Sequence, residues 1–168
     1  KQAVKYYELA AAQGHAMAQH NAGVCFLKGC GVETDVKKAL KYLKLAAAQG
    51  NAEAQAHIGE LFAEGLVVAQ DLRKALKYFE LAAAQGHADA QCYAGRCFAQ
   101  GLGVAQDLKQ AVKYYELAAA QGHGEAQWKA GQCFDQGLGV EQDMDKAIEY
   151  YTQALASKEG EWRVGRES

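Results

Sequence analysis

The chain contains no proline, few hydroxyl residues and no long apolar run. Because proline is the residue that most reliably breaks a helix, its absence leaves helical segments uninterrupted. Outside tyrosine, the hydroxyl residues are Thr34, Thr152, Ser157 and Ser168, and none accompanies a histidine in a triad-like pattern. No segment approaches the roughly 18–20 consecutive apolar residues that cross a bilayer. The composition therefore predicts neither a hydroxyl nucleophile nor direct membrane insertion.

The charge and the motifs exclude several further classes. The 18 basic and 20 acidic residues give a net charge of −2, and no polybasic run indicates nucleic-acid binding. No metal-binding, P-loop or dinucleotide spacing occurs, so we expect no catalytic residue, no metal and no cofactor. The five cysteines are odd in number and lack a paired spacing. This favours a reducing intracellular compartment, cytoplasm or organelle matrix, over secretion.

The strongest positive feature is a repeat of 36 residues. The segment Leu-Ala-Ala-Ala-Gln-Gly returns at residues 9–14, 45–50, 81–86 and 117–122. A fixed period of this size is typical of a solenoid, in which each unit buries its apolar face against its neighbours. The expected domain covers residues 1–158, as a half-repeat at 1–14 followed by full repeats at 15–50, 51–86, 87–122 and 123–158.

Each repeat predicts two helices, named here helix A (about residues 16–28 in the first repeat) and helix B (about 35–49). Apolar residues at helical spacing mark helix B, as in Ala39, Leu43 and Ala46. An aspartate such as Asp35 is a natural N-cap, and a glycine such as Gly50 is a natural C-terminal residue. The fold class expected is an all-α solenoid of antiparallel helix pairs.

Four local expectations follow from the positions of single residues. The turn between the helices carries Gly-x-Gly-Val, but the second repeat has Val67 in place of the second glycine, which predicts an altered turn. His87 and His123, with His15 and Asn51 at the same place, are expected to cap helix A. His20 and His57 are expected on different faces. Cys30, in a turn, is the expected exposed thiol.

The motifs resemble those of the Sel-one-like repeat, a relative of the tetratricopeptide repeat. The resemblance is carried by Ala-x-Ala-Gln-x-x-x-Gly-x-x-Phe, then Gly-x-Gly-Val-x-x-Asp-x-x-x-Ala-x-x-Tyr, then Ala-Ala-x-x-Gly. It implies a right-handed superhelix whose concave side is lined by helix A. It also implies a non-catalytic adaptor that assembles complexes through protein or peptide partners. Some secreted relatives carry a regular cysteine pair in each repeat, and that pairing is missing here.

Function must then lie in helix A positions that vary between repeats. The resemblance places four rows on the concave side, beginning at Met17, His20, Val24 and Leu27. The candidate partner-binding residues are Trp128, Arg96, Glu60, Gln132, Asp135, Cys92, His20, Val24 and Leu27. Trp128 is the leading candidate, because tryptophan and arginine most often dominate interface energetics. The alternative is that Trp128 covers the last repeat interface.

Three functional hypotheses remain open from the sequence. The first is a scaffold that holds a partner in the helix A groove. The second is a structural accessory subunit docked by its flanks or ends into a large assembly. The third, disfavoured by the missing cysteine pairs and catalytic geometry, is a secreted hydrolase-like or cell-wall-active repeat protein.

We also expect the chain to be a segment of a longer protein, because residue 1 falls inside a helix B. Residues 159–168 leave the repeat pattern and are either a cap or an anchor for a partner.

Overall fold

The computed structural model describes residues 2–157, and all regular structure in that range is α-helical. The nine helices of this range are α1 (Gln2–Ala12), α2 (Ala16–Lys28), α3 (Val36–Ala48), α4 (Ala52–Glu64), α5 (Leu72–Ala84), α6 (Ala88–Gln100), α7 (Leu108–Ala120), α8 (Gly124–Gln136) and α9 (Met144–Ala156). Even-numbered helices are helix A of each repeat, and odd-numbered helices are helix B. The all-α repeat fold expected from the sequence is confirmed.

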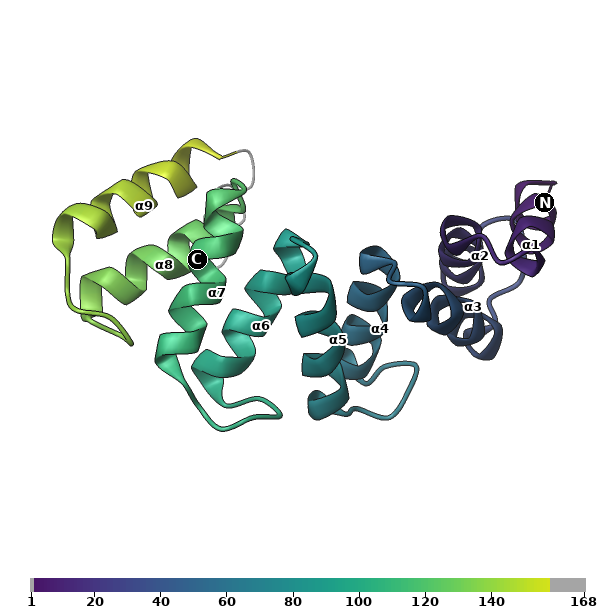
Figure 1. Ribbon diagram of the computed structural model, residues 1–168, viewed down its shortest axis with the longest axis horizontal. Coiled ribbons are helices and arrows are strands. Elements are labelled where there is room, and N and C mark those ends of the chain that lie inside the picture. Colours follow the sequence, from purple (N-terminus) through teal and green to yellow (C-terminus); the bar gives the residue numbers. More distant parts are fainter. Residues whose placement is uncertain (1, 158–168) are drawn as a thin grey trace. The chain divides into compact units, whose positions relative to one another are not determined.

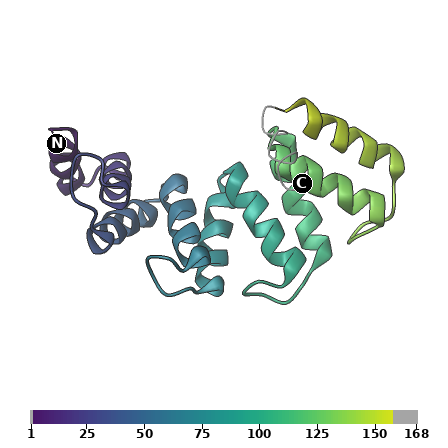
Figure 2. The same cartoon turned by 180° about the vertical axis from the view of Figure 1, so that it is seen from behind.

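Contacts divide the chain into two compact units, residues 1–85 with α1–α5 and residues 86–168 with α6–α9. Within the second unit, α6 with α7 and α8 with α9 form antiparallel pairs joined by a loop at one end (Figure 1). The same pairing is seen from behind in Figure 2. In the first unit, α2 pairs with α3 and α4 pairs with α5, while α1 packs on α2 as the helix B of a preceding repeat.

Polar caps fix where each helix begins. The Asp71 carboxylate accepts a hydrogen bond of 3.0 Å from the Lys74 N–H, and the aspartates of the other three full repeats cap helix B in the same way. At helix A, Nδ1 of His123 accepts from the Ala126 N–H at 3.2 Å, as His87 and Asn51 do one and two repeats earlier. His15 makes no side-chain cap bond. The capping expectation is thus confirmed for every full repeat except the first.

A glycine in each helix A lets a large helix B side chain approach. A Cβ atom on Gly59 would lie 2.7 Å from Cε1 of Phe79, which is closer than van der Waals contact allows. Phe79 is 1% exposed, so this glycine makes room for a fully buried ring. The equivalent pairs are Gly23 with Leu43, Gly95 with Tyr115, and Gly131 with Tyr151.

The turn of the second repeat differs, as its valine predicts. Gly31, Gly103 and Gly139 adopt positive φ of 75°, 71° and 74°, whereas no non-glycine residue among those described has a positive φ. Val67 therefore takes a different backbone conformation, because its β-branched side chain disfavours the left-handed region. Gly139 shows a second reason for the glycine, since a Cβ there would collide with the Leu108 backbone at the start of α7.

Buried glutamines link neighbouring repeats within each unit, which was not among the expectations from the sequence. The side chains of Gln19, Gln55, Gln91 and Gln127 are 4–6% exposed. Nε2 of Gln55 donates to the Ala47 carbonyl at 3.2 Å, and its Oε1 accepts from Nε2 of Gln85 at 2.8 Å. These bonds tie the start of helix A to the carbonyl end of the preceding helix B and to the end of its own repeat. Residues 159–168, expected to cap the repeats or to anchor a partner, lie outside the described residues.

Candidate partner-binding surface

The helix A surface of the second unit carries an aromatic cluster around Trp128. Trp128 is half-buried on α8, and its ring centroid lies 4.3 Å from that of Tyr151 on α9. The Tyr151 hydroxyl donates to Oδ2 of Asp135 at 3.2 Å. Because Gly131 leaves no side chain beneath the Tyr151 ring, α9 approaches α8 closely here. Trp128, Tyr151 and Asp135 are thus ordered by contacts within one repeat, and the Trp128 ring remains partly exposed.

Arg96 lies on α6 of the same unit. Its guanidinium carbon lies 4.5 Å from the centroid of the Tyr93 ring, one turn earlier on α6, in cation–π geometry. Arg96 and its register equivalent Gln132 on α8 are both half-buried. An arginine held over an aromatic ring loses less side-chain freedom when it binds a partner, which favours a contact role.

Cys92 corrects the expected row of surface residues. It is 6% exposed and belongs to the core cluster with Tyr115, so it offers no surface to a partner. Ala56, at the same register position, is 4% exposed. The position faces the packed side of helix A, and the longer side chains His20 and Trp128 reach from it toward the surface. The rows were read from register alone, which does not show how deeply a side chain is buried.

His20 and His57 lie together, contrary to the expectation that they occupy different faces. Nε2 of His20 on α2 lies 3.1 Å from Nδ1 of His57 on α4, and their rings stack at 5.1 Å between centroids. Burial, reinforced by the charge of His57, lowers the pKa of His20. Since one of the two facing ring nitrogens must donate and the other must accept, the contact excludes protonation of both imidazoles at once. The pair joins the first two full repeats.

The other candidates in the first unit, Val24, Leu27 and Glu60, are all half-buried. Leu27 packs against core clusters of α1–α4, so only part of its side chain is available to a partner. Val24 and Glu60 share one register position on α2 and α4. Among the four residues at which the expected rows begin, Met17 is the most exposed, with 61% of its surface accessible.

A junction histidine performs a second task that the sequence did not reveal. Nε2 of His123 lies 2.9 Å from Oδ1 of Asp89, which links α6 to the start of α8. The hydrogen bond from His123 lowers the pKa of Asp89, and Asp89 in turn raises the pKa of His123. The cap bond at Nδ1 opposes that rise, because a protonated Nδ1 could not accept from the Ala126 N–H. Asp89 is thus committed to the junction rather than free for a partner.

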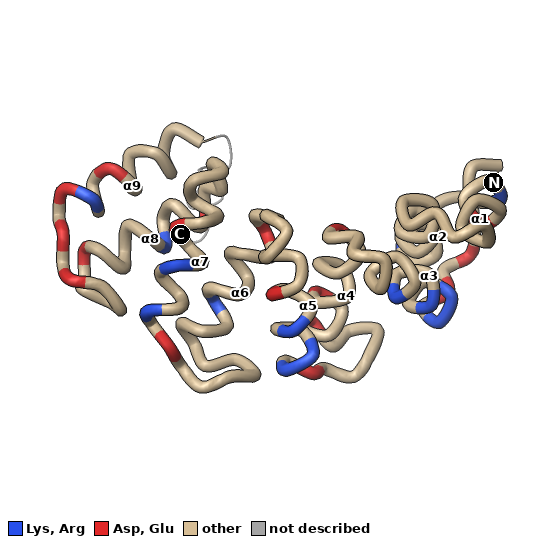
Figure 3. The backbone as a smooth tube through the Cα atoms, in the orientation of Figure 1, with Lys and Arg blue, Asp and Glu red and all other residues tan. Residues whose placement is uncertain are grey.

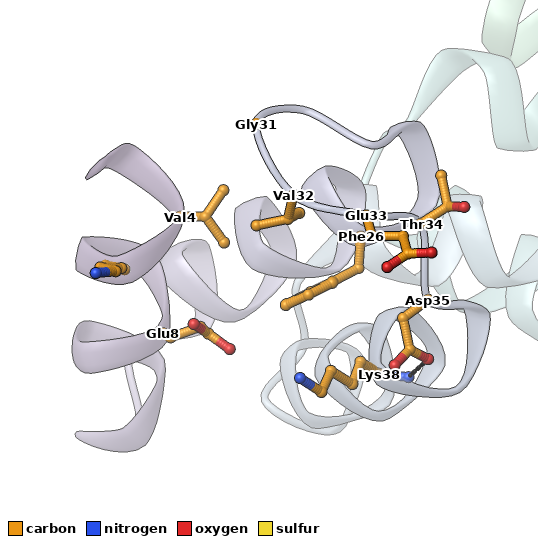
Figure 4. Close-up of a pocket in the computed structure, with 10 residues that line it drawn as sticks. Val4, Glu8, Phe26, Gly31, Val32, Glu33, Thr34, Asp35 and Lys38 are labelled. Atoms are coloured by element: carbon orange, nitrogen blue, oxygen red, sulfur yellow. Dashed lines mark hydrogen bonds between the residues drawn. The ribbon is translucent and has the colours of Figure 1, made fainter. Parts of the chain in front are cut away.

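A recess of about 660 Å³ lies in the first unit between α1 and the turn that joins α2 to α3 (Figure 4). Val4, Val32 and Phe26 form its apolar wall, and Nζ of Lys38 lies 5.1 Å from the centroid of the Phe26 ring. Oδ1 of Asp35 accepts the Lys38 N–H as a helix cap at 3.0 Å. These side chains are occupied by packing and capping, so the recess does not suggest a reaction.

Charge is distributed unevenly over the helix B surfaces. Figure 3 shows basic residues on α3 and α5, which are Lys37, Lys38, Lys41, Lys44, Arg73, Lys74 and Lys77. Acidic residues gather on α9 and the turn before it, at Glu141, Asp143, Asp145 and Glu149.

In residues 2–157 no group of three metal-ligating side chains is positioned to hold an ion. In that range, none of the helices combines the length and apolarity needed to cross a membrane.

The comparisons with known proteins decide the family. The model of the Sel1 repeat matches residues 1–15, 16–51, 52–87, 88–123 and 124–158. The chain belongs to the Sel1 repeat family. Its matched repeats follow the period read from the sequence, with boundaries one residue later. Sel1 repeat proteins are generally non-enzymatic scaffolds for protein interaction.

Solved Sel1 structures share the architecture. A Sel1 repeat protein from Oxalobacter formigenes is 32% identical, with a TM-score of 0.83, over 97% of this chain and 68% of that protein. The protective antigen c5321 of uropathogenic Escherichia coli is 30% identical, with a TM-score of 0.88, over 90% of this chain and 32% of that protein. This Sel1 chain thus spans about a third of c5321.

A third similar structure is the cysteine rich protein B of Helicobacter pylori. It is 26% identical, with a TM-score of 0.60, over 74% of this chain and 90% of that protein. The five cysteines all lie in residues 2–157 and form no disulfide there, with Cys30 exposed as expected and Cys92, Cys97 and Cys133 buried. No curated protein is similar enough to count as a relative.

Proposed function

We propose that this Sel1 chain is a non-catalytic adaptor that helps to assemble a multiprotein complex by binding a protein or peptide partner through its helix A surface. The observation that carries the proposal is that the second unit holds two prearranged pairs of side chains on its helix A surface, one with a half-buried tryptophan and one with a half-buried arginine. Trp128 is held 4.3 Å from Tyr151, and Arg96 lies over Tyr93. Half-buried, prearranged aromatic and arginine side chains are the features that most often anchor protein interfaces.

Register comparison supports a contact role for Trp128 and Arg96. The position of Trp128 holds Ala56 and Cys92 in other repeats, and both of these are buried and small. Packing of the repeat therefore does not require a tryptophan. Arg96 likewise shares its position with Val24, Glu60 and Gln132. Because these side chains differ so much in size and charge, a shared packing role does not explain them. Their variation supports a role in partner recognition.

A second candidate function has its own observation. Leu9, Leu45, Leu81 and Leu117, one on each of α1, α3, α5 and α7, are 44–65% exposed on helix B. An apolar residue at one exposed register position would suit a structural accessory subunit docked by its flanks. The two functions differ in which helices contact the partner.

Affinity capture of the chain with its partners, followed by cross-linking mass spectrometry, separates these functions. The adaptor predicts cross-links at helix A lysines, Lys28 and Lys129. Docking by the flanks predicts cross-links at Lys41, Lys77 and Lys113 on helix B. Cross-links confined to helix B in a stoichiometric complex would overturn the adaptor proposal, as would a capture that retains no partner.

A further inference from the structure

Two of the five cysteines flank the end of helix α2. Cys25 lies in the last turn of α2, and Cys30 directly follows the C-cap residue Gly29. The N–H groups of Gly29 and Cys30 both donate to the Cys25 carbonyl, at 2.9 and 3.1 Å. Gly29 has a φ of 71°, which turns the chain back over the end of the helix. The turn therefore brings Cys30 back to Cys25.

The two thiols of this helix end are close enough for a disulfide. With ordinary bond lengths, the N–O distance of 3.1 Å keeps the Cα atoms of Cys25 and Cys30 within about 7 Å. A disulfide can join Cα atoms up to about that separation. Side chains at these two places of such a helix end pack on each other. The pKa of the Cys25 thiol is raised first by burial and then by the charge and hydrogen bonding of the Cys30 thiol, so the two thiols lie side by side.

Packing of the repeat does not require a thiol at the place of Cys30. The equivalent pairs in the second unit are Cys97 with Leu102 and Cys133 with Leu138, and each has the same backbone hydrogen bond at 2.9 Å. A leucine thus suits the second place, and among the full repeats the first alone carries cysteine at both places. The first repeat therefore holds a dithiol that packing does not explain.

The surroundings of the two thiols differ in a way that orders their reactions. Cys30 is exposed, so a small oxidant in solvent reaches its sulfur directly. Cys25 is half-buried and packs against the cluster of Val4, Phe26 and Ala39. Because its raised pKa keeps Cys25 mostly as the thiol, and the thiolate is the reactive form, Cys25 reacts more slowly with such oxidants. An exposed cysteine beside a second one that can resolve it is typical of a redox-sensitive pair.

We propose that hydrogen peroxide, or another small hydroperoxide, converts Cys25 and Cys30 into a reversible disulfide at the end of α2. The Cys30 thiolate attacks one peroxide oxygen, the O–O bond breaks, and the leaving hydroxide takes up a proton as water. Sγ of Cys25 then attacks Sγ of the Cys30 sulfenic acid, which forms the S–S bond and releases the hydroxyl group with the Cys25 proton as a second water. Peroxide accepts the two electrons that the thiols lose, and a dithiol reductant returns them by thiol–disulfide exchange.

The disulfide acts on the turn that follows Cys30. Gly31, Val32, Glu33 and Thr34 belong to this turn and line one side of the recess beside α1 (Figure 4). Covalent attachment of Cys30 to α2 removes conformational freedom at the start of the turn. Oxidation therefore holds this wall of the recess more firmly, and reduction releases it.

Peptide mapping of the full chain tests the disulfide, because trypsin cleaves after Lys28, between the two cysteines. The reduced chain is treated with hydrogen peroxide, blocked with N-ethylmaleimide, denatured and digested without reductant. We expect the peptides of residues 6–28 and 29–37 to stay joined until dithiothreitol is added, and the undigested chain to have the mass of a monomer. Separate peptides, or joined peptides that come from a disulfide-linked dimer, would overturn the proposal.

Two serine variants test the order of the steps. In Cys25→Ser, peroxide should oxidise Cys30 to the sulfinic acid, because no neighbouring thiol resolves the sulfenic acid. In Cys30→Ser, Cys25 should react several-fold more slowly and be recovered as the N-ethylmaleimide adduct. Equal oxidation rates of the two remaining thiols would refute the assigned order.

Hydrogen exchange tests the effect on the turn. Peroxide should slow the exchange of residues 29–34 several-fold in the parent chain and should leave their exchange in Cys25→Ser unchanged. Equal exchange in the oxidised and reduced parent chain would refute the effect on the recess wall.

Discussion

Replacing Gln55 with methionine tests whether the buried glutamine network stabilises the repeats. Methionine has a similar length but cannot donate or accept the two hydrogen bonds that Gln55 makes with Ala47 and Gln85. The Ala47 carbonyl keeps a bond from the Gly50 N–H, and the Gln85 side chain reaches solvent, so neither partner is left buried and unsatisfied. At about 1 kcal/mol per bond, the expected loss of unfolding free energy is about 2 kcal/mol.

Gln127→Met is the matched control, because the same substitution there has a different predicted cost. Gln127 makes one bond, to Ala119, and carries the buried acceptor without a partner. Removing both should change the unfolding free energy by about 1 kcal/mol or less in either direction. Urea unfolding by circular dichroism, with hydrogen exchange of α4 and α8, measures the two costs separately. Equal destabilisation by the two variants would refute the reasoning.

Three further predictions concern helix packing, pH and the turns. Gly59→Ala should lower the unfolding free energy by ~1–3 kcal/mol, because the new methyl group meets the Phe79 ring, and adding Phe79→Leu should recover part of the loss. Because folding lowers the pKa of His20, the unfolded chain protonates this histidine before the folded chain does as pH falls. The contribution of His20 to stability is therefore complete above pH 6.5 and is lost as pH falls through the lowered pKa. His20→Asn should flatten this pH dependence of the melting temperature, and an unchanged slope would contradict the prediction. Gly139→Ala should lower the melting temperature, because it adds a Cβ where φ is 74° and the Leu108 backbone lies adjacent; a melting temperature equal to that of the parent would show that this turn can move.

The sequence predicted the fold well because its signals are local and repeated. Apolar spacing, aspartate caps and C-terminal glycines act within a few residues, and each is seen in several repeats. Asp71 caps helix B, and Gly50 has a φ of 84°, as expected. The turn at Val67 could be predicted for the same reason, since a β-branched residue cannot follow a glycine conformation.

The candidate surface was harder to predict, because the burial of each side chain depends on contacts between repeats. Register alone put Cys92 in one row with Trp128, although the structure buries the cysteine. It also separated His20 from His57, which meet across two repeats at 3.1 Å. The glutamine network had a visible signal, a polar residue recurring among buried alanines. A buried amide must find partners, so that recurrence could have indicated the network.

The most direct test of the adaptor function is the affinity of the captured partner for two alanine variants. Trp128→Ala removes the half-buried ring on helix A, and Leu117→Ala removes an aliphatic side chain that is 53% exposed on helix B. Isothermal titration calorimetry should show a loss of about 2 kcal/mol or more, roughly thirtyfold in Kd, for Trp128→Ala and little change for Leu117→Ala. Weaker binding by Leu117→Ala, with Trp128→Ala unaffected, would contradict the adaptor account and favour docking by the flanks.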